Sequence, residues 1–414
     1  MKSLLSPLAL LAALVMTLSG CARTIPPPTS AESASPSAPT VETSDEKPDK
    51  LPDDSQSEST AQLTEAAASP QLCAYLPVSS LPEDAAAALE PYRQSISSLD
   101  YLILNTGVYW AADGTLEVSP AFSQTAKLLS GQTKLWATVN PKGALVREGS
   151  AGSSIATEQQ RQTLCQNILK LCREYSLDGI DIDWEYPGTS LAGIGSHVND
   201  KENYTLLLKA LRESLNHMEG EKSLSVAVGG DVYFALQTDM KAASKYLDYV
   251  QLMTYDLQGG FQKVTGHHAA LYHSEGNLLD VCVDKAVKAF HEAGVPMEKL
   301  ILGVPFYSRQ WNGVKGEGCR HGLGMEADSV GGYGGDYAEL KADWIGKNGF
   351  VRYWDEVAKV PYLFDGKTFV SYEDEESLGG KIEYLKEMGM GGIMFWEYKC
   401  DPSGELLGYI REQL

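Results

Sequence analysis

Short runs of β-branched and aromatic residues alternate with amphipathic stretches from about residue 70 to the end of the chain. This alternation is typical of repeated strand and helix units. It predicts eight strands, at 72–76, 101–106, 134–139, 179–184, 224–229, 249–254, 300–304 and 392–396. Helical periodicity between them is clearest at 158–175 and 203–218, where leucine and isoleucine recur on one side. We therefore expect an α/β fold, a (β/α)8 TIM barrel with its catalytic groups at the carboxyl ends of the strands.

The last two predicted strands are unusually far apart in the sequence. Ile301 and Gly391 are separated by 90 residues, whereas most strand-to-strand intervals run from about 25 to 50. Residues 306–371 therefore predict an inserted module, a small α+β lobe beside the strand-end face of the barrel. A helix near 377–388 would then lead the chain back to the eighth strand. The folded domain is expected to span 71–414, with this insertion between strand seven and its helix.

The first 21 residues have the pattern of an export signal. Lys2 is followed by an apolar run from Leu8 to Leu18, which is too short to span a bilayer comfortably. The ending Leu18-Ser19-Gly20-Cys21 resembles the lipobox of bacterial lipoproteins, which implies cleavage before Cys21 and acylation of its thiol. This resemblance predicts an exported protein on the bacterial cell surface or the outer face of a membrane. A plain secretory signal with a chance cysteine is the alternative.

Residues 22–70 have the composition of a tether. This stretch holds eight Pro and fifteen Ser or Thr, nine acidic and three basic residues, and neither Gly nor an aromatic residue. Such a segment buries too little apolar surface to offset the entropy lost on ordering, so we expect a disordered linker.

The charge of the chain is strongly acidic. It carries 34 Lys and Arg against 55 Asp and Glu in 414 residues, a formal net charge of −21. Because an acidic protein repels phosphate backbones and anionic lipid surfaces, we expect no nucleic-acid partner and no membrane contact beyond a lipid anchor. We expect the acidic surface mainly to confer solubility, with a neutral or cationic partner as the alternative.

The cysteines give no metal signature. Apart from Cys21 they are Cys73, Cys165, Cys172, Cys282, Cys319 and Cys400. Cys165 and Cys172 lie about 10 Å apart along one predicted helix, too far for a mutual bridge. No Cys-x-x-Cys or Cys/His spacing predicts a metal site, and we expect neither a metal nor a cofactor. Free, half-buried thiols are favoured, and other pairings are left open.

One predicted strand carries the candidate chemistry. In the run Asp178-Gly179-Ile180-Asp181-Ile182-Asp183-Trp184-Glu185, acidic and apolar residues alternate with a period of two. Asp181, Asp183 and Glu185 thus share one face, about 7 Å apart in succession, and in a barrel the apolar face meets the helices. Burial and mutual repulsion raise at least one carboxyl pKa, as a general acid near neutral pH requires.

Two other interpretations of this run fit it less well. A solvated edge strand does not explain the isoleucines and tryptophan between the acids. A divalent-cation loop of the EF-hand type needs Gly where Tyr186 stands.

Several motifs together resemble glycoside hydrolase family 18, the chitinase family. Asp178 to Glu185, followed by Tyr186-Pro187, is similar to its Asp-Gly-x-Asp-x-Asp-x-Glu signature on strand four. The stretches 251–256, 303–309 and 391–397 resemble its strands six, seven and eight, and 265–268 with 271–272 recurs in bacterial members. The segment 306–371 resembles the insertion lobe of the subgroup with deep clefts. The likeness covers essentially residues 70–414.

The resemblance implies substrate-assisted hydrolysis with retention, a known exception to the two-carboxylate rule. It implies that Glu185 protonates the leaving oxygen and that Asp183 orients the substrate acetamido N–H, with Asp181 as its inner partner. Tyr255 would hydrogen-bond the acetamido oxygen, and Trp396 would form the floor under the reacting sugar. The remaining substrate-contact positions implied by the resemblance are Tyr75, Asp178, Tyr186, Met253, Asp256, Tyr307 and Arg309. For His267 and His268 we expect a packed or hydrogen-bonded role.

The sequence also departs from the family pattern. Ala137-Thr138-Val139-Asn140 stands where strand three usually ends in Ser-x-Gly-Gly, and strand two lacks the expected Phe near Val108. These departures leave the substrate preference open.

The partner expected from the resemblance is an N-acetylglucosamine-containing oligo- or polysaccharide, cleaved at β-1,4 linkages by a monomeric enzyme. Peptidoglycan or N-glycan cores are alternative substrates. A non-catalytic carbohydrate-binding lipoprotein is a further alternative, but Glu185 argues against it. A solute-binding lipoprotein would share the anchor and lack the acidic strand.

Overall fold

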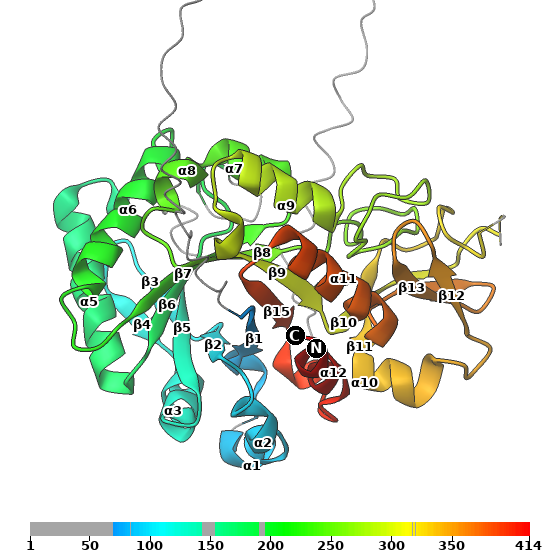
Figure 1. Cartoon of the computed structure of the whole chain (residues 1–414), viewed down its shortest axis with the longest axis horizontal. Coiled ribbons are helices and arrows are strands. Elements are labelled where there is room, and N and C mark those ends of the chain that lie inside the picture. The colour runs from blue at the N-terminus through cyan, green and yellow to red at the C-terminus, as the bar shows by residue number, and fades with distance from the viewer. Residues whose placement is uncertain (1–68, 83, 143–153, 190–194, 317, 319) are drawn as a thin grey trace, which may run out of the picture. The chain divides into compact units, whose positions relative to one another are not determined.

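Eight parallel strands form a closed ring in the computed structural model, which describes residues 69–82, 84–142, 154–189, 195–316, 318 and 320–414 (Figure 1). They are β1 (Gln71–Pro77), β2 (Tyr101–Asn105), β5 (Lys134–Pro141), β6 (Gly179–Asp183), β7 (Ser223–Gly229), β8 (Tyr249–Met253), β9 (Leu300–Pro305) and β15 (Gly392–Trp396). They pair in the order β2-β1-β15-β9-β8-β7-β6-β5, and the β2–β5 pairing closes the ring. The predicted (β/α)8 TIM barrel is confirmed.

Helices surround this ring in Figure 1. They are α1 (Ala85–Leu89), α2 (Arg93–Ile96), α3 (Pro120–Leu129), α5 (Glu158–Tyr175), α6 (Asp200–Leu215), α7 (Val232–Gln237), α8 (Met240–Ala243), α9 (Val283–Glu292), α11 (Glu375–Met388) and α12 (Glu405–Gln413). Helix α5 begins at a capping box formed by Thr157 and Gln160, which satisfies free backbone N–H groups at its start. Helix α6 runs three residues nearer the amino terminus than the leucine pattern predicts, because its first turn is polar and starts at Asp200.

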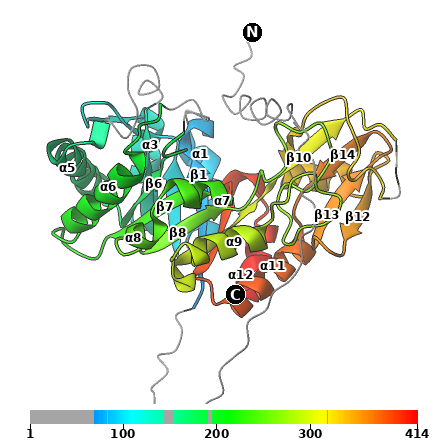
Figure 2. The ribbon, with the colours of Figure 1, turned by 90° about the horizontal axis from the view of Figure 1, so that it is seen from above.

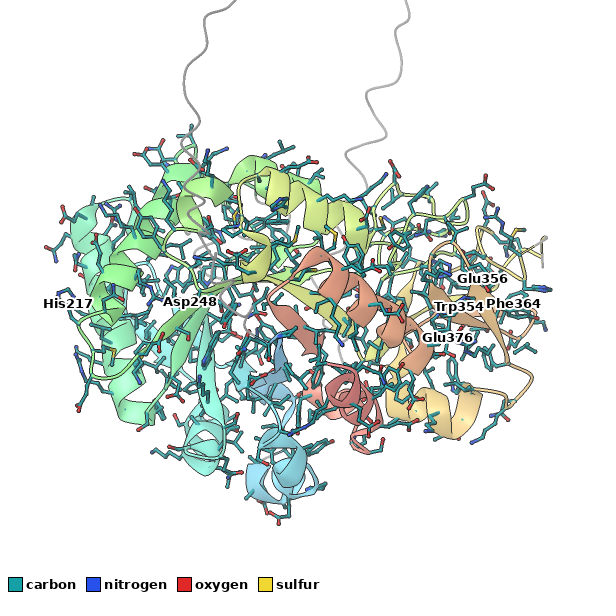
Figure 3. All side chains as sticks on the ribbon, in the orientation of Figure 1. His217, Asp248, Trp354, Glu356, Phe364 and Glu376 are labelled. Atoms are coloured by element: carbon teal, nitrogen blue, oxygen red, sulfur yellow. The ribbon has the colours of Figure 1, made fainter. Side chains whose placement is uncertain are left out.

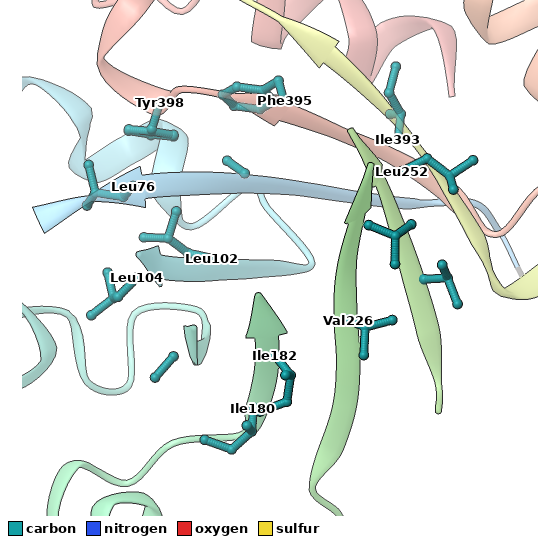
Figure 4. Close-up of a cluster of buried hydrophobic side chains, with 14 of the residues drawn as sticks. Leu76, Leu102, Leu104, Ile180, Ile182, Val226, Leu252, Ile393, Phe395 and Tyr398 are labelled. Carbon is teal, nitrogen blue, oxygen red and sulfur yellow. The ribbon is translucent and has the colours of Figure 1, made fainter. Parts of the chain in front are cut away.

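The strands separate two apolar cores. One lies between strands and helices, and Figure 4 shows Leu76, Ile180, Ile182, Val226 and Phe395 among the strand residues that supply it. The second lies inside the ring. Its residues are Cys73, Tyr75, Tyr101, Ile103, Trp136, Ile301 and Met394. The inner core fills the lower part of the barrel, so polar side chains have room only toward the carboxyl ends of the strands.

Between β9 and α11 the chain forms a second, antiparallel sheet. Its strands are β10 (Tyr307–Asn312), β11 (Gly332–Asp336), β12 (Val351–Asp355), β13 (Val360–Phe364) and β14 (Thr368–Ser371), in the order β11-β10-β14-β13-β12, with the short helix α10 (Tyr337–Glu339). Figure 2 shows this sheet to one side of the barrel strands. Trp354, Glu356 and Phe364 lie there, away from His217 and Asp248 on the barrel side (Figure 3).

A short hairpin was not predicted. Strands β3 (Val108–Trp110) and β4 (Leu116–Val118) form an antiparallel pair, and β3 also pairs in parallel with β5. Three-residue strands are too short to show a period in the sequence. The buried Trp110 side chain anchors this hairpin by packing edge-on against Trp184.

The structure describes only some of the segments for which the sequence gives expectations on chain organisation. The signal peptide, Cys21 and linker residues 22–68 lie outside the described residues. Within the part of the chain that is described, no helix is long and apolar enough to cross a membrane. The described cysteines Cys73, Cys165, Cys172, Cys282 and Cys400 are free thiols and all buried, rather than half-buried as expected.

Candidate active site

The acidic residues of β6 lie inside the barrel. Asp181 is fully buried and Asp183 is 7% exposed, whereas Ile180 and Ile182, between and before them, belong to the outer core. This division follows from the strand, because successive side chains point to opposite faces. Glu185 comes two residues after Asp183, just past the end of β6, and continues the same alternation to the mouth of the barrel.

Asp181 is held by three hydroxyl groups. Ser225 Oγ donates to Oδ1 at 2.6 Å, and Tyr75 Oη and Thr138 Oγ1 donate to Oδ2 at 3.0 and 3.2 Å. Thr138 and Ser225 stand directly opposite Asp181 on the two flanking strands, so the strand register builds this contact. Burial raises the pKa of Asp181 to about 6, and the three hydroxyl donors limit the rise by favouring the carboxylate.

Asp183 is the most strongly perturbed acid of the strand. Burial raises its pKa well above the ordinary value, and the nearby carboxyl groups of Glu185 and Asp181 raise it further. Asn140 Nδ2 opposes this rise by donating to Asp183 Oδ2 at 2.9 Å. Three acids this close cannot all be ionised, so at least one proton stays within the group.

Glu185 faces a cavity of about 450 Å³ at the carboxyl ends of the strands. Its pKa is raised, chiefly by burial, with the charge of Asp256 adding to the effect. A carboxyl group that keeps its proton nearer to neutral pH and faces a cavity can serve as a general acid.

The cavity brings most of the predicted residues together. The predicted residues that line it are Tyr75, Asp183, Glu185, Tyr186, Met253, Tyr255, Asp256, Tyr307 and Trp396. They come from β1, from the carboxyl ends of β6, β8 and β15 or the residues just after them, and from the start of β10, as expected for a barrel of this kind. Asp181 lies beneath Asp183 and acts on the cavity only through its neighbours. Arg309 binds the cavity residue Asp256 through its guanidinium group.

The structure corrects the expectation that Asp178 contacts substrate. Asp178 precedes β6, at the amino end of the barrel, and its Oδ2 accepts a hydrogen bond from the Leu135 main-chain N–H at 3.0 Å. It does not line the cavity. The signature motif runs the full length of a strand, so its first and last acids lie at opposite ends of the barrel and serve different purposes.

The two histidines are buried beside the site. His268 Nδ1 lies 3.6 Å from Asp256 Oδ1, and burial lowers the pKa of His268 to about 4, so its ring is neutral near neutral pH. His267 Nε2 lies 3.1 Å from Asp355 Oδ2 on β12. Neither ring lines the cavity, so both serve packing and hydrogen bonding.

Two groups of residues at the site were not predicted from the sequence. One group surrounds the acids: Asn105, Thr138, Asn140 and Ser225. The alternation along 134–141 puts Thr138 and Asn140 on one face of the strand but does not indicate that either contacts an acid. The other group forms a largely apolar wall of the cavity, with Tyr233 and Phe234 from α7 and Phe261, Leu279 and Val281 from the segment after β8. No local pattern distinguishes these wall residues from ordinary loop residues.

Comparison with known proteins places this geometry in a family. The family described as glycosyl hydrolases family 18 matches residues 139–401, more than half of the chain. The chain belongs to glycosyl hydrolases family 18. The matched range contains the acidic strand, the cavity residues Met253, Tyr255, Asp256 and Tyr307, and Trp396.

Three similar proteins illustrate this family 18 relationship. Chitinase A1 of Niallia circulans is 36% identical over 281 residues, which are 63% of this chain and 40% of that protein. Chitotriosidase-1 of Mus musculus is 35% identical over 261 residues, 60% of this chain and 54% of that protein. The chain thus spans about half the length of these curated relatives. A solved family 18 N-acetylglucosaminidase from Paenibacillus barengoltzii is 38% identical, with a TM-score of 0.74, over 83% of this chain and 100% of that one.

Proposed function

We propose that the chain is a retaining glycoside hydrolase that cleaves β-1,4 linkages of N-acetylglucosamine-containing glycans, chitin or its oligosaccharides, by substrate-assisted catalysis. The observation that carries the proposal is the row of inward-facing acids along β6, in which buried Asp181 and Asp183 are followed by Glu185 at the cavity. Membership of family 18 and the chitinases among its relatives support the choice of glycan.

In the proposed first step the substrate supplies the nucleophile. Glu185 gives its proton to the leaving glycosidic oxygen, the bond from that oxygen to the anomeric carbon breaks, and the acetamido carbonyl oxygen bonds to that carbon. Asp183 accepts the acetamido N–H, and Tyr255 donates its hydroxyl to the acetamido oxygen. Glu185 then takes a proton from the water that opens the oxazolinium ring, which restores the enzyme with retained configuration.

Cavity shape supports a stacked sugar. Trp396 lines the cavity beside Tyr75, with ring centroids 5.7 Å apart, and an indole face packs well against the apolar face of a pyranose. The described lining residues include the acids Asp183, Glu185, Asp231 and Asp256 and no Lys, Arg or His. Among the alternative substrates, a neutral glycan therefore suits this lining better than the anionic lactyl group of peptidoglycan.

The Glu185→Gln variant tests the proposal. Glutamine keeps the shape and cannot donate the proton, so turnover of an N-acetylglucosamine oligomer is expected to fall by more than about 100-fold. NMR of the first product formed by the unaltered enzyme should show the β-anomer. Glu356→Gln, an exposed change on the small sheet, is the matched control and should keep full activity. Undiminished turnover by Glu185→Gln would refute the assignment.

A second candidate concerns the cleavage mode. The Paenibacillus barengoltzii N-acetylglucosaminidase aligns over its whole length, which favours release of single sugars from a chain end. A time course of product lengths from a defined oligosaccharide separates this end-acting mode from cleavage within the chain, because monomer is the first product only in end-acting cleavage. Digestion of peptidoglycan and of N-glycan cores in parallel tests the other substrates.

We also propose that the protein is exported and anchored by lipid at Cys21, with residues 22–70 as a tether. The proposal is supported by the lipobox-like ending of the apolar segment. Radiolabelled palmitate should be incorporated by the bacterial host into the unaltered chain and not into Cys21→Ser.

A further inference from the structure

Asn140, at the carboxyl end of β5, makes two contacts with Asp183 on the neighbouring strand. Its Nδ2 lies 2.9 Å from Asp183 Oδ2 and 3.2 Å from the main-chain carbonyl oxygen of Asp183. Strands β5 and β6 are parallel, with Val139 opposite Ile182, so the next residue of each strand is brought alongside the other. The contact is therefore built into the barrel and does not depend on a loop.

The carbonyl contact decides which end of the Asn140 amide faces Asp183. A main-chain carbonyl oxygen accepts hydrogen bonds and cannot donate one. The NH2 end must face Asp183, because the reversed amide would press its own oxygen against two acceptors. Asp183 Oδ2 is then an acceptor as well and carries no proton. On its other side Asp183 is hydrogen-bonded to the Glu185 side chain, an interaction that favours ionised Glu185, so the two acids compete for one proton.

A second amide acts in the same direction. Asn105 ends β2, the strand that pairs with β5 on its other side, and its 3% exposed side chain lines the cavity. Burial and the charges of Glu185 and Asp181 raise the pKa of Asp183, whereas hydrogen bonds from Asn140 and Asn105 lower it. The two amides are thus the groups that favour the carboxylate.

Within the described part of the chain, no positive charge lowers the pKa of Asp183 in their place. The titratable groups facing Asp183 are Asp181 and Glu185 of its own segment, Tyr75 of β1, Tyr109 of β3, Tyr186 after β6, Tyr204 of α6 and Tyr255 after β8. All of these are acids or phenols. The balance of protons between Asp183 and Glu185 therefore depends on neutral donors, which is where a single amide has most influence.

We propose that Asn140 is a positioning residue for the reaction, whose amide donates to Asp183 Oδ2, favours the ionised form of Asp183 and so shifts the proton of the Asp183–Glu185 pair toward Glu185. The inference rests on the proposed function, in which Glu185 must carry that proton and Asp183 must accept the acetamido N–H. Without the amide the proton resides on Asp183 over a wider range of pH. Glu185 is then ionised and cannot protonate the leaving oxygen, although the substrate still fits the cavity.

The test is the Asn140→Ala variant, with Asn140→Asp as a shape-matched second variant that lacks the amide donor. Carbon-13 NMR of the Asp carboxyl groups, with Asp183 assigned from Asp183→Asn, follows protonation without any substrate. The Asp183 titration midpoint is expected to move up by about 1 to 2 pH units in Asn140→Ala. With the oligomer, kcat should fall by about tenfold or more while KM changes little, and the acidic limb of the pH profile should move in the same direction.

The control is Asn167→Ala on α5. Asn167 Nδ2 also donates a hydrogen bond, at 2.7 Å, but to the Gly114 carbonyl outside the cavity. It should leave the Asp183 titration and the pH profile unchanged. An Asp183 midpoint that stays in place, or moves down, in both Asn140 variants would overturn the inference. If the unaltered enzyme cleaves no glycan, the proposed function fails, and the NMR titration still decides whether Asn140 holds Asp183 ionised.

Discussion

Arg309 of β10 and Asp256 after β8 face each other through two parallel contacts. Arg309 Nε lies 2.7 Å from Asp256 Oδ1, and Nη2 lies 2.5 Å from Oδ2. Burial alone would raise the pKa of Asp256, but His268 and Arg309 outweigh it and hold that pKa below its ordinary range. The first strand of the small sheet therefore keeps a cavity acid ionised.

Replacing Arg309 should weaken catalysis in a way that depends on pH. Arg309→Lys can make only one of the two contacts, and we expect kcat/KM to fall by about tenfold, with a larger loss in Arg309→Leu. Because the Asp256 pKa rises when the guanidinium is lost, Asp256 takes up its proton at a higher pH and the loss should be greatest at acidic pH. Measurement of kcat/KM from about pH 4 to 8 checks this.

A second arginine provides the control for this prediction. Arg352 lies on β12 of the small sheet and does not line the cavity. It also makes two ionic contacts, to Asp374 and Glu376 at the start of α11. Arg352→Lys should leave the pH profile unchanged. Equal losses for the two arginines at every pH would mean that the Arg309 pair serves only the packing of the small sheet.

The buried acid Asp183 should lower the stability of the folded state near neutral pH. The pKa of Asp183 is higher in the folded protein than in the unfolded chain, so the folded state binds more protons between these two pKa values. The stability of the fold therefore falls as the pH rises from the unfolded pKa to the folded one. Asp183→Asn removes that cost and still accepts the Asn140 hydrogen bond. We expect its melting temperature to exceed that of the unaltered protein at neutral pH, with the difference vanishing below about pH 4.

Scanning calorimetry across the pH range checks this, with the exposed Asp343→Asn as control. A lower melting temperature of Asp183→Asn at all pH values would show that the carboxylate stabilises the fold.

The sequence is sufficient to predict the barrel because two signals indicate each strand: its own apolar run and the periodicity of the helices around it. Buried parallel strands give short apolar runs, and the helices between them show a clear period. All eight predicted strands match a strand of the ring within two residues at each end. The β3–β4 hairpin was missed because its strands have three residues each and are held by contacts distant in sequence, such as that of Trp110 with Trp184.

The site was predictable only where one strand carries it. Asp181, Asp183 and Glu185 reveal themselves by their alternation, and most of the other predicted residues follow from motif resemblance. Ser225 and Asn140 have no such mark, because their role arises from the register of β7 and β5 against β6. The misplacement of Asp178 has a different cause: resemblance to the motif assigned every acid of the run to the site, although Asp178 precedes its strand and so lies at the end opposite the cavity.

A buried ion pair beside the site should be essential for stability. Lys381 of α11 and Glu373 are both fully buried and in contact, Lys381 Nζ also donates to the Ala269 carbonyl at 2.7 Å, and Ser377 Oγ donates to Glu373. Lys381→Met leaves the buried Glu373 without its charge partner. We expect a loss of about 3 to 5 kcal/mol in the free energy of unfolding, measured by chemical denaturation.

Two further variants separate the charge effect from packing. The double variant Lys381→Met with Glu373→Leu should recover most of the loss, because no buried charge remains. Lys341→Met breaks a pair with Glu405 at the surface and should cost less than about 1 kcal/mol. If Lys381→Met were as mild as Lys341→Met, the buried pair would contribute no more than an exposed one.

The hydroxyl groups around Asp181 should set its protonation. Ser225 Oγ makes the shortest of the three contacts, at 2.6 Å, and a donated hydrogen bond favours the ionised carboxylate. Ser225→Ala should therefore raise the pKa of Asp181 above about 6, so that Asp181 remains protonated at a higher pH. Thr138→Val, which removes the 3.2 Å contact from the opposite flanking strand, should act in the same direction and more weakly. Carboxyl carbon-13 titration measures both shifts directly. A pKa of Asp181 that falls in Ser225→Ala would mean that the serine hydroxyl accepts a hydrogen bond from Asp181 instead of donating one, and that Asp181 is neutral in the resting protein.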